Sequence, residues 1–196
     1  SSVLKKGINK ANEAILEYTS KNPEASGMGT TSVCAIVAGN NVTLANVGDS
    51  RAYVISDTTG IRQETKDHSF VQKLVDAGQL EDSEMESHPR KNELTKALGI
   101  APKVKVEVAE NPILAKNGDK FLMCSDGLCG LVNDLTISNT INSTVGLDAV
   151  NELISLAENA GGNDNISVGI IEVVDSPHSK TIFKDQKNIS LESTQI

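Results

Sequence analysis

Apolar side chains near the amino terminus recur at spacings of four and three residues. Leu4, Ile8, Ala11, Ile15 and Tyr18 make up this series. Residues three and four apart lie on the same face of an α-helix, so the pattern predicts an amphipathic helix. The helix begins at the first residues of the chain with no capping residue or lead-in. We therefore expect a further segment to precede Ser1 in the natural protein.

After Gly27 the pattern becomes typical of β-strands. The continuous apolar run at 32–38 (SVCAIVA) predicts a strand that is buried on both faces. In the next strand-like segment Val42, Leu44 and Asn46 alternate with Thr43, Ala45 and Val47, and a third strand-like run follows at 52–56. Only short turns separate these runs, which predicts antiparallel pairing of neighbouring strands.

The next segment is polar and is predicted to be mainly helical. Apolar residues on one face indicate a helix over 70–77 that stops at Gly78. Ser83, with Glu86 three residues later, resembles a capping box. The pattern at 94–99 predicts one more short helix that ends at its glycine.

The carboxyl-terminal part alternates between strand and helix patterns. We predict a half-buried strand at 104–108, a strand at 120–124, an amphipathic helix at 147–156 and a closing strand at 166–174. From 176 to 196 the composition turns polar, which favours a mobile tail or linker. Residues 1–175 are thus expected to form one domain with a sizeable core.

The charge balance excludes one class of partner. The chain has 26 acidic and 18 basic residues, a formal net charge of −8. Affinity for a nucleic-acid backbone comes from clustered Lys and Arg, so we expect no nucleic-acid partner. An acidic surface is compatible with a protein that gathers divalent cations. No apolar run is long enough to span a membrane, and no signal peptide is recognisable.

The three cysteines do not form a standard zinc or redox motif. Cys124 and Cys129 have a C-x4-C spacing, which matches neither class. Cys34 and Cys124 lie in apolar strand-like runs, where a cysteine behaves as a small buried hydrophobe. We expect reduced thiols and a cytoplasmic location.

Two aspartates lie at the ends of predicted strands. Asp126 follows the strand at 120–124, and Asp164 lies in a Gly-Gly-Asn-Asp-Asn loop that leads into the strand at 166–174. If these strands pair, the carboxylates converge, and a cation would offset their repulsion. Carboxylate and water ligands favour Mg2+ or Mn2+ over zinc. Taken alone, however, such sequences are more often plain turns and loops than ligand sets.

Six blocks of sequence follow one another along the chain. They are 27–31 (GMGTT), 45–53 (ANVGDSRAY), 65–69 (TKDHS), 88–92 with 94–99 (HPRKN and LTKALG), 124–128 (CSDGL) and 161–166 (GGNDNI). In this order they resemble the metal-dependent protein phosphatase family, the protein phosphatase 2C type, in its bacterial branch. Each block alone is weakly specific, but six collinear blocks that reach nearly to Val174 are a highly specific signal.

The resemblance implies hydrolysis of phosphoserine and phosphothreonine in proteins. Asp126 and Asp164 match the two aspartates that hold one metal of the family's binuclear centre, and Asp67 matches an aspartate that helps to bind a third, weaker metal. Asn165 would orient Asp164, and Gly127 lies beside Asp126 in the same surroundings. No side chain is expected to act as a nucleophile, because similar enzymes use a water that bridges two Mn2+ or Mg2+ ions.

The resemblance also implies the fold. We expect an α+β protein in which two antiparallel sheets form a β-sandwich flanked by helices, a four-layer αββα arrangement that is incomplete at the amino terminus. Residues 67–101 match the flap beside the active site, which is thought to influence substrate access. The substrates would be phosphoproteins made by a serine/threonine kinase. The complete enzyme is expected to be a cytoplasmic monomer with two or three metal ions.

Other residues of the blocks are interpreted as structural. Asp49 is expected to hydrogen-bond backbone groups at a strand junction, and Arg51 to be a paired structural cation. His68 and His88 lie in polar stretches and are expected to be solvated rather than to act as general acids. The glycines of block 27–31 are expected to permit tight entry into the following strand.

Part of the family pattern does not occur in the 196 residues. It comprises an acidic residue in an Asn-Glu-Asp-like block, the phosphate-binding arginine, and a D-G-x-G-G block whose aspartate bridges both metals. We favour loss of an upstream segment over a naturally short, silent domain or a separate fragment that completes the sheet. A lone fragment would lack a bridging carboxylate and expose a sheet edge, so we expect it to be inactive.

Two other functions compete with the general protein phosphatase. One is a catalytically silent regulatory or interaction module that keeps the fold without the chemistry. The other is a phosphatase that acts on an anti-sigma-factor antagonist, which shares the fold. The long block at 67–101 favours the general protein phosphatase.

Overall fold

The computed structural model describes residues 2–174, and the tail predicted at 176–196 lies outside them. The described helices are α1 (Ser2–Lys21), α2 (Phe70–Asp76), α3 (Asp126–Cys129), α4 (Asp134–Ser143) and α5 (Gly146–Asn159), with 3-10 helices at Pro23–Ala25 and Asp82–Ser87. The strands are β1 (Ser32–Ala38), β2 (Asn41–Val47), β3 (Arg51–Ser56), β4 (Gly60–Gln63), β5 (Glu107–Val108), β6 (Ile113–Leu114), β7 (Lys120–Cys124) and β8 (Val168–Glu172). The domain limits of 1–175 stay a prediction.

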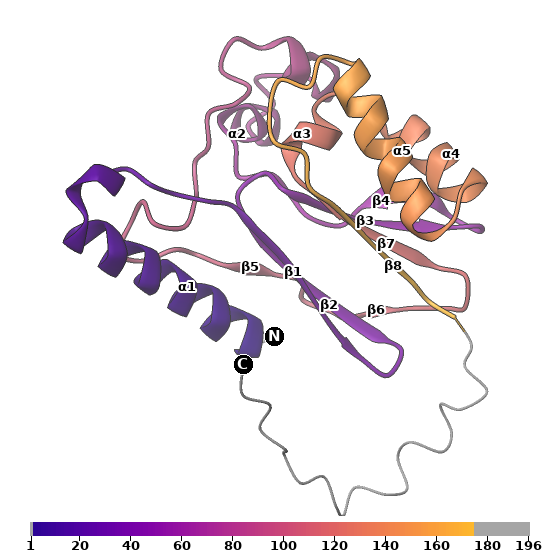
Figure 1. The fold of residues 1–196 in the computed structure, drawn as a ribbon, viewed down its shortest axis with the longest axis horizontal. Coiled ribbons are helices and arrows are strands. Elements are labelled where there is room, and N and C mark those ends of the chain that lie inside the picture. Colours follow the sequence, from indigo (N-terminus) through magenta and orange to yellow (C-terminus); the bar gives the residue numbers. More distant parts are fainter. Residues whose placement is uncertain (1, 175–196) are drawn as a thin grey trace, which may run out of the picture.

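These strands form two antiparallel sheets (Figure 1). One sheet has the order β1-β2-β5, with β6 also paired to β2, and the other has the order β4-β3-β7-β8. The pairs joined by short turns, β1 with β2 and β3 with β4, are antiparallel as predicted. Strands β7 and β8 also pair, although 43 residues lie between Cys124 and Val168 in the sequence. This pairing brings the two aspartate motifs to one end of the sheet.

The two sheets pack face to face. Side chains alternate between the faces of a strand, and Val42 and Leu44 of β2 lie between the sheets with Phe121 of β7. Ala45 and Val47 of the same strand lie in a second apolar cluster on the outer face. Strand β2 is therefore buried on both faces, and each face packs into a different apolar cluster.

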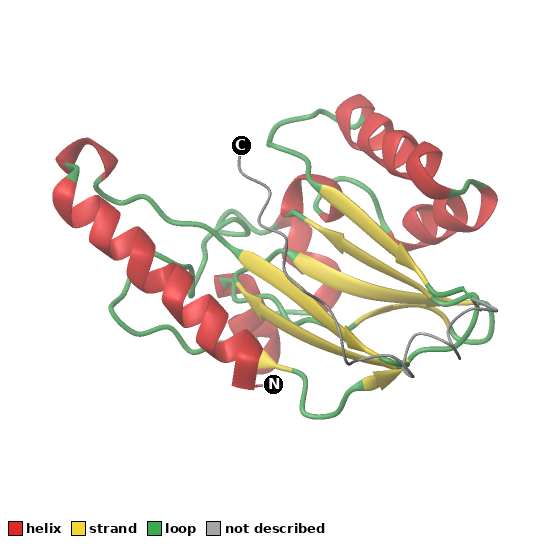
Figure 2. Cartoon of the chain, turned by 60° about the horizontal axis from the view of Figure 1, so that its bottom comes forward, coloured by secondary structure: helices red, strands yellow, loops and turns green. Residues whose placement is uncertain are grey.

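Helices cover both outer faces of the sandwich (Figure 2). Helix α1 contributes Leu4 and Ile8 to the cluster on the outer face of β2. On the opposite side, Ile137 of α4 and Leu153 of α5 pack against β3 and β7. The α+β class and the four-layer αββα arrangement predicted from the family resemblance are confirmed.

The buried face of α1 differs in part from the predicted one. Leu4 and Ile8 are buried, but Ala11 and Tyr18 are exposed. The next buried position is Asn12, which is only 1% exposed. Its side-chain nitrogen donates to the Ala101 carbonyl at 3.0 Å, and its oxygen accepts from the Gly99 N–H at 2.8 Å. Asn12 can be buried because both polar atoms of its side chain form hydrogen bonds with backbone groups of the loop at 99–101.

The prediction that strand 32–38 is buried on both faces is wrong. No residue of β1 is fully buried, and its last two residues are exposed. Within the described residues β1 pairs only with β2 and is therefore an edge strand. A continuous apolar run does not by itself distinguish a central strand from an edge strand.

The segment predicted to be helical at 94–99 is extended. Leu98 forms an isolated β-bridge with Thr30, and Leu94 forms another with Ser69. Gly99 has a φ of +84°, and a Cβ at this position would lie 2.6 Å from the Met28 carbonyl oxygen. Long-range pairing of the chain therefore overrides the local helical pattern.

Several predicted boundaries of helices and strands differ slightly from the observed ones. The helix at 70–76 ends before Gly78 as predicted, but the capping box is formed by Glu81 and Glu84 rather than by Ser83 and Glu86. The half-buried strand at 104–108 is limited to its last two residues, and the closing strand spans 168–172. Strands β4 and β6 and helix α4 were not predicted. Helix α4 is mostly polar, and only Ile137 and Ile141 mark its buried side among apolar residues.

The cysteines are free thiols in different degrees of burial. All three cysteines are free, with Cys124 and Cys129 buried and Cys34 half-buried. A hydrogen bond with Cys129, together with burial, raises the pKa of the Cys124 thiol well above its ordinary value. Within residues 2–174, no helix is both long and apolar enough to cross a bilayer.

Candidate metal centre and active-site pocket

Asp126 and Asp164 line one pocket of about 200 Å³. Their positions follow from the pairing of β7 and β8, in which Cys124 lies opposite Val168. Asp126 comes two residues after β7, as the first residue of helix α3, and Asp164 comes four residues before β8. The same pocket is lined by Asp49, Asp67 and Glu86, so five carboxylates from separate parts of the sequence surround it.

Backbone contacts fix the two aspartate loops against each other. The Ser125 hydroxyl donates to the Asn165 carbonyl at 3.1 Å and accepts from the Ser167 N–H at 3.0 Å. Gly127 packs so closely that an added Cβ would lie 2.4 Å from the Asn165 carbonyl oxygen. The Asn165 N–H donates to Asp164 Oδ1 at 2.7 Å. The family resemblance suggested that Asn165 orients Asp164. In the structure the contact between the two residues is made by the Asn165 backbone N–H.

The carboxylates of the pocket interact electrostatically. Burial, and after it the charge of Asp164, raises the pKa of Asp126 above its ordinary value. Burial, and after it the charge of Asp126, raises the pKa of Asp49 to about 6. Both shifts mean that the ionised forms repel one another and are poorly solvated. A divalent cation in the pocket would relieve both effects.

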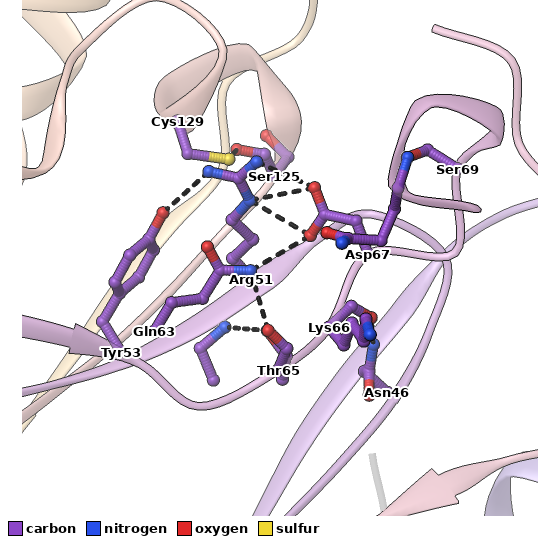
Figure 3. A network of polar contacts seen from close by, with 12 residues as sticks. Asn46, Arg51, Tyr53, Gln63, Thr65, Lys66, Asp67, Ser69, Ser125 and Cys129 are labelled. Carbon is purple, nitrogen blue, oxygen red and sulfur yellow. Dashed lines mark hydrogen bonds and ion pairs between the residues drawn. The ribbon is translucent and has the colours of Figure 1, made fainter. Parts of the chain in front are cut away.

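Asp67 is held by an arginine at the edge of this pocket (Figure 3). Arg51 Nε lies 3.1 Å from each carboxylate oxygen of Asp67, and Arg51 Nη2 lies 2.8 Å from Oδ2. Gln63 donates to Asp67 Oδ1 at 3.2 Å, and Arg51 Nη1 donates to the Tyr53 hydroxyl at 3.1 Å. Burial alone would lower the pKa of Arg51, but the hydrogen bonds with Asp67 raise it overall. The prediction that Arg51 is a paired cation is confirmed.

His68 is buried, so the expectation that it is solvated is wrong. Its Nδ1 accepts from the Gly48 N–H at 3.0 Å, and its Nε2 lies 3.2 Å from Glu107 Oε1. Burial lowers the pKa of His68, which favours the neutral ring. With Nδ1 as an acceptor, the neutral ring carries its proton on Nε2, directed to the Glu107 side. His68 therefore holds the Gly48 turn through its ring and its backbone N–H, a structural role, while its buried Nε2 forms no hydrogen bond with the described residues.

The flap predicted at 67–101 contributes to the pocket wall. Met85, Glu86, Lys91 and Asn92 line the same pocket as the aspartates. Arg90 stacks on the Phe70 ring at 3.5 Å, and the Phe70 N–H donates to the Glu93 carbonyl at 2.8 Å. His88 is half-buried, and its Nδ1 accepts from the Arg90 N–H at 3.1 Å. These contacts fold the flap on itself beside the carboxylates.

Asp49 belongs to the pocket, although the sequence pointed to a purely structural role. It follows β2 directly after Gly48, in the same strand-end position that singled out Asp126. Applying the strand-end rule to every Asp next to a glycine would have found it. What the sequence could not show is that the end of β2 and the end of β7, in different sheets, meet at one pocket.

The raised pKa of Asp49 predicts a pH dependence of stability in the metal-free chain. The pKa is about 6 when folded against an ordinary value of 3.8, so the folded state binds more protons between these values. Stability therefore falls as the pH rises through this range and then levels off. Asp49→Asn should remove this fall, giving a higher Tm than wild type at pH 7 and a shrinking difference below pH 4. Thermal unfolding in EDTA across this range checks it, and parallel profiles for the two proteins would refute it.

Comparison with known proteins identifies the family. The family model described as protein phosphatase 2C matches residues 1–74. The serine/threonine phosphatase stp of Listeria welshimeri is 39% identical over 170 residues, covering 86% of this chain and 66% of the Listeria protein. The crystal structure of the serine/threonine phosphatase Stp1 from Staphylococcus aureus superimposes with a TM-score of 0.81 at 35% identity, over 89% of this chain and 68% of that one. The chain belongs to the protein phosphatase 2C family.

The structure of another similar protein contains metal ions. The catalytic domain of the serine/threonine protein phosphatase PstP, solved in complex with two manganese ions, has a TM-score of 0.76 and 35% identity over 88% of this chain and 70% of that one. The present chain spans just under two thirds of the Listeria phosphatase. Membership in the protein phosphatase 2C family and the fold are therefore shown, and the resemblance inferred from the six blocks is confirmed.

The residues present fit a hard divalent cation in part. Within residues 2–174, no three Asp, Glu, His or Cys side chains are arranged to hold a metal by themselves. Magnesium in proteins usually keeps several waters and is bound through one or two carboxylates. Asp126 and Asp164 supply two such oxygen donors, which suit Mn2+ or Mg2+ better than zinc. The pocket of this protein phosphatase 2C member thus fits a cation whose remaining ligands are water or further carboxylates.

Proposed function

We propose that this chain forms the larger part of a metal-dependent serine/threonine protein phosphatase. Its substrates would be phosphoserine and phosphothreonine residues placed on proteins by a serine/threonine kinase, and it would act as a monomer in the cytoplasm with Mn2+ or Mg2+. The observation that carries this proposal is the convergence of Asp126 and Asp164 in one acidic pocket. The likeness to the serine/threonine phosphatases of Listeria welshimeri and Staphylococcus aureus supports it.

Each side chain of the pocket has a definite part in this proposal. Asp126 and Asp164 would hold one cation between the ends of β7 and β8, and Asp67 would contribute to a weaker site. Lys91 and Asn92 of the flap also line the pocket, and in this proposal they would donate hydrogen bonds to phosphate oxygens and orient the phosphoryl group. The bound cations would supply an activated water and stabilise the charge that develops on the phosphoryl oxygens.

The number of ligands limits the activity of the 196 residues alone. A binuclear centre needs a carboxylate that both cations share, and the D-G-x-G-G block that supplies it in the family does not occur in this sequence. Asp126 and Asp164 can hold one cation but cannot hold a second at bridging distance without that group. We therefore infer that these 196 residues bind Mn2+ but turn over substrate very slowly by themselves.

A chimera tests the proposed activity. The amino-terminal segment of a family member, with its D-G-x-G-G block, is joined in front of Ser1, and phosphate release from a phosphothreonine peptide is measured. We expect turnover with Mn2+ that is lost in EDTA and restored by excess Mn2+, because the carboxylates act only through the cation. The 196-residue chain assayed alone is the reference for the slow background.

The alternative of a catalytically silent module has one observation in its favour, the lack of a three-ligand group among residues 2–174. It differs from the phosphatase in its outcome with the chimera. A folded chimera that binds Mn2+ but releases no phosphate would establish the silent module and reject the phosphatase.

A further inference from the structure

Both oxygens of the Asp67 carboxylate already accept hydrogen bonds from Arg51 and Gln63. Three contacts from Arg51 between 2.8 and 3.1 Å, together with the Gln63 amide at 3.2 Å, engage both of its oxygens. The Asp67 side chain is only 8% exposed, so little water reaches it. A carboxylate with two oxygens offers about four lone-pair sites, and three N–H groups of Arg51 and Gln63 occupy most of them. A cation can reach Asp67 only by displacing at least part of this set.

Arg51 is well placed to compete with a cation. Its guanidinium grips Asp67 through two nitrogens, the geometry in which arginine and carboxylate bind most strongly. It also lines the acidic pocket itself, so its positive charge lies beside the positions that cations would take. The Tyr53 hydroxyl, 3.1 Å from Arg51 Nη1, offers a hydrogen bond that the guanidinium can keep when it leaves Asp67 (Figure 3). Asp67 thus has two possible cationic partners, one built into β3 and one from solution.

We propose that Arg51 is a positioning residue that sets the strength of the weak cation site by competing with the metal for Asp67. In the guanidinium-bound state Asp67 is closed to the metal, and in the metal-bound state Arg51 is released toward the pocket. The weak site is then filled only when the metal concentration is high enough to overcome the internal ion pair. This inference rests on the proposed function, because it takes Asp67 as a ligand of the weaker site.

Mn2+ binding to the 196-residue chain tests the competition without any assay of activity. The electron paramagnetic resonance signal of free Mn2+ gives the isotherm, which we expect to contain a tighter class at Asp126 and Asp164 and a weaker class at Asp67. Arg51→Gln should tighten the weaker class by roughly tenfold, the lower end of the effect that neighbouring groups have on metal affinity. The tighter class should change much less.

Three control variants separate competition from general electrostatics. Arg62→Gln removes the same charge from an exposed arginine that pairs with Glu64, and should leave the weaker class unchanged. Arg51→Lys keeps the charge but loses the two-pronged contact, and should give an intermediate affinity. Combining Asp67→Asn with Arg51→Gln should abolish the gain, because the competed ligand is gone.

Loss of Arg51 leaves a buried carboxylate without its partner and lowers stability. A second measurement therefore uses thermal unfolding. Mn2+ should raise the Tm of Arg51→Gln more than that of wild type, since a ligand that binds the folded state stabilises it by mass action. Unchanged affinity of the weaker class in Arg51→Gln, or a gain that persists with Asp67→Asn, would overturn the inference. No Mn2+ binding by wild type at any concentration would instead reject the proposed function.

Discussion

Replacing Asp126 by asparagine is expected to reduce Mn2+-dependent phosphate release by the chimera on the order of 100- to 1000-fold. The change removes one anionic oxygen donor from the pocket while keeping the shape of the side chain, so the cation that stabilises the developing charge is held poorly. Asp164→Asn should have the same effect, because the two carboxylates line the same pocket from β7 and β8. The assay is initial-rate phosphate release from a phosphothreonine peptide across a range of Mn2+ concentrations.

Asp134→Asn is the matched control for this prediction. Asp134 is exposed in the first turn of α4 and does not line the pocket, so the variant loses the same charge without touching the candidate site. Its rate should stay within about twofold of the unsubstituted chimera, since surface substitutions away from special features have small effects. If Asp126→Asn and Asp134→Asn retained equal activity, Asp126 would have no role in binding the metal.

The second large effect is expected at Gly127. Alanine at this position would place a Cβ 2.4 Å from the Asn165 carbonyl oxygen, a contact that only a shift of one loop can relieve. Since the Asn165 N–H holds Asp164 at 2.7 Å, the shift moves Asp164 away from Asp126. We expect Mn2+ affinity to fall about 10- to 100-fold, as when partners of metal ligands are replaced. The crowding should also lower the free energy of unfolding by about 1–3 kcal/mol.

Gly7→Ala is the control for Gly127→Ala. Gly7 lies in α1, and a Cβ there meets nothing within 4 Å. Alanine in a helix interior is favoured over glycine by about 0.5–1 kcal/mol, so this variant should be slightly more stable with unchanged Mn2+ affinity. Calorimetric Mn2+ titration and thermal unfolding of the two variants decide the matter. Normal Mn2+ affinity in Gly127→Ala would show that the two loops do not position each other.

The strands beside the two aspartate motifs could be predicted, because the runs at 120–124 and within 166–174 form β7 and β8. Their pairing stayed a condition of the prediction, because only strands joined by short turns can be paired from sequence and 43 residues separate Cys124 from Val168. The order of layers came from the family resemblance, since periodicity alone gives strands and helices but no topology.

Other features depend on contacts that no local pattern contains. Asn12 is buried because its side chain accepts a hydrogen bond from the Gly99 N–H, and among residues 2–174 β1 lies at a sheet edge although its sequence is as apolar as that of a central strand. The extended chain around Leu98 follows from its bridge to Thr30. At Leu98 this long-range pairing outweighs the local helical preference of the segment.

The same limit applies to the candidate site. Asp67 was identified from the sequence block at 65–69. Its ion pair with Arg51 forms only because β3 and the 65–69 loop lie side by side. Asp49 joins the pocket through the packing of two different sheets. The sequence therefore pointed to the candidate ligands beside clear strands, and it named Asp49 and Arg51 only as structural residues without placing them in the pocket.

The central claim is that Asp126 and Asp164 bind the same divalent ion, and a double-mutant cycle of Mn2+ affinity tests it most directly. Mn2+ dissociation constants of the tighter class are measured for the 196-residue chain, for Asp126→Asn, for Asp164→Asn and for the double variant. If both carboxylates hold one ion, each single variant should already lose most of the affinity, and the double variant should lose far less than the sum of the two free-energy changes. Additive losses in the cycle, or a tighter class that survives in the double variant, would contradict the account.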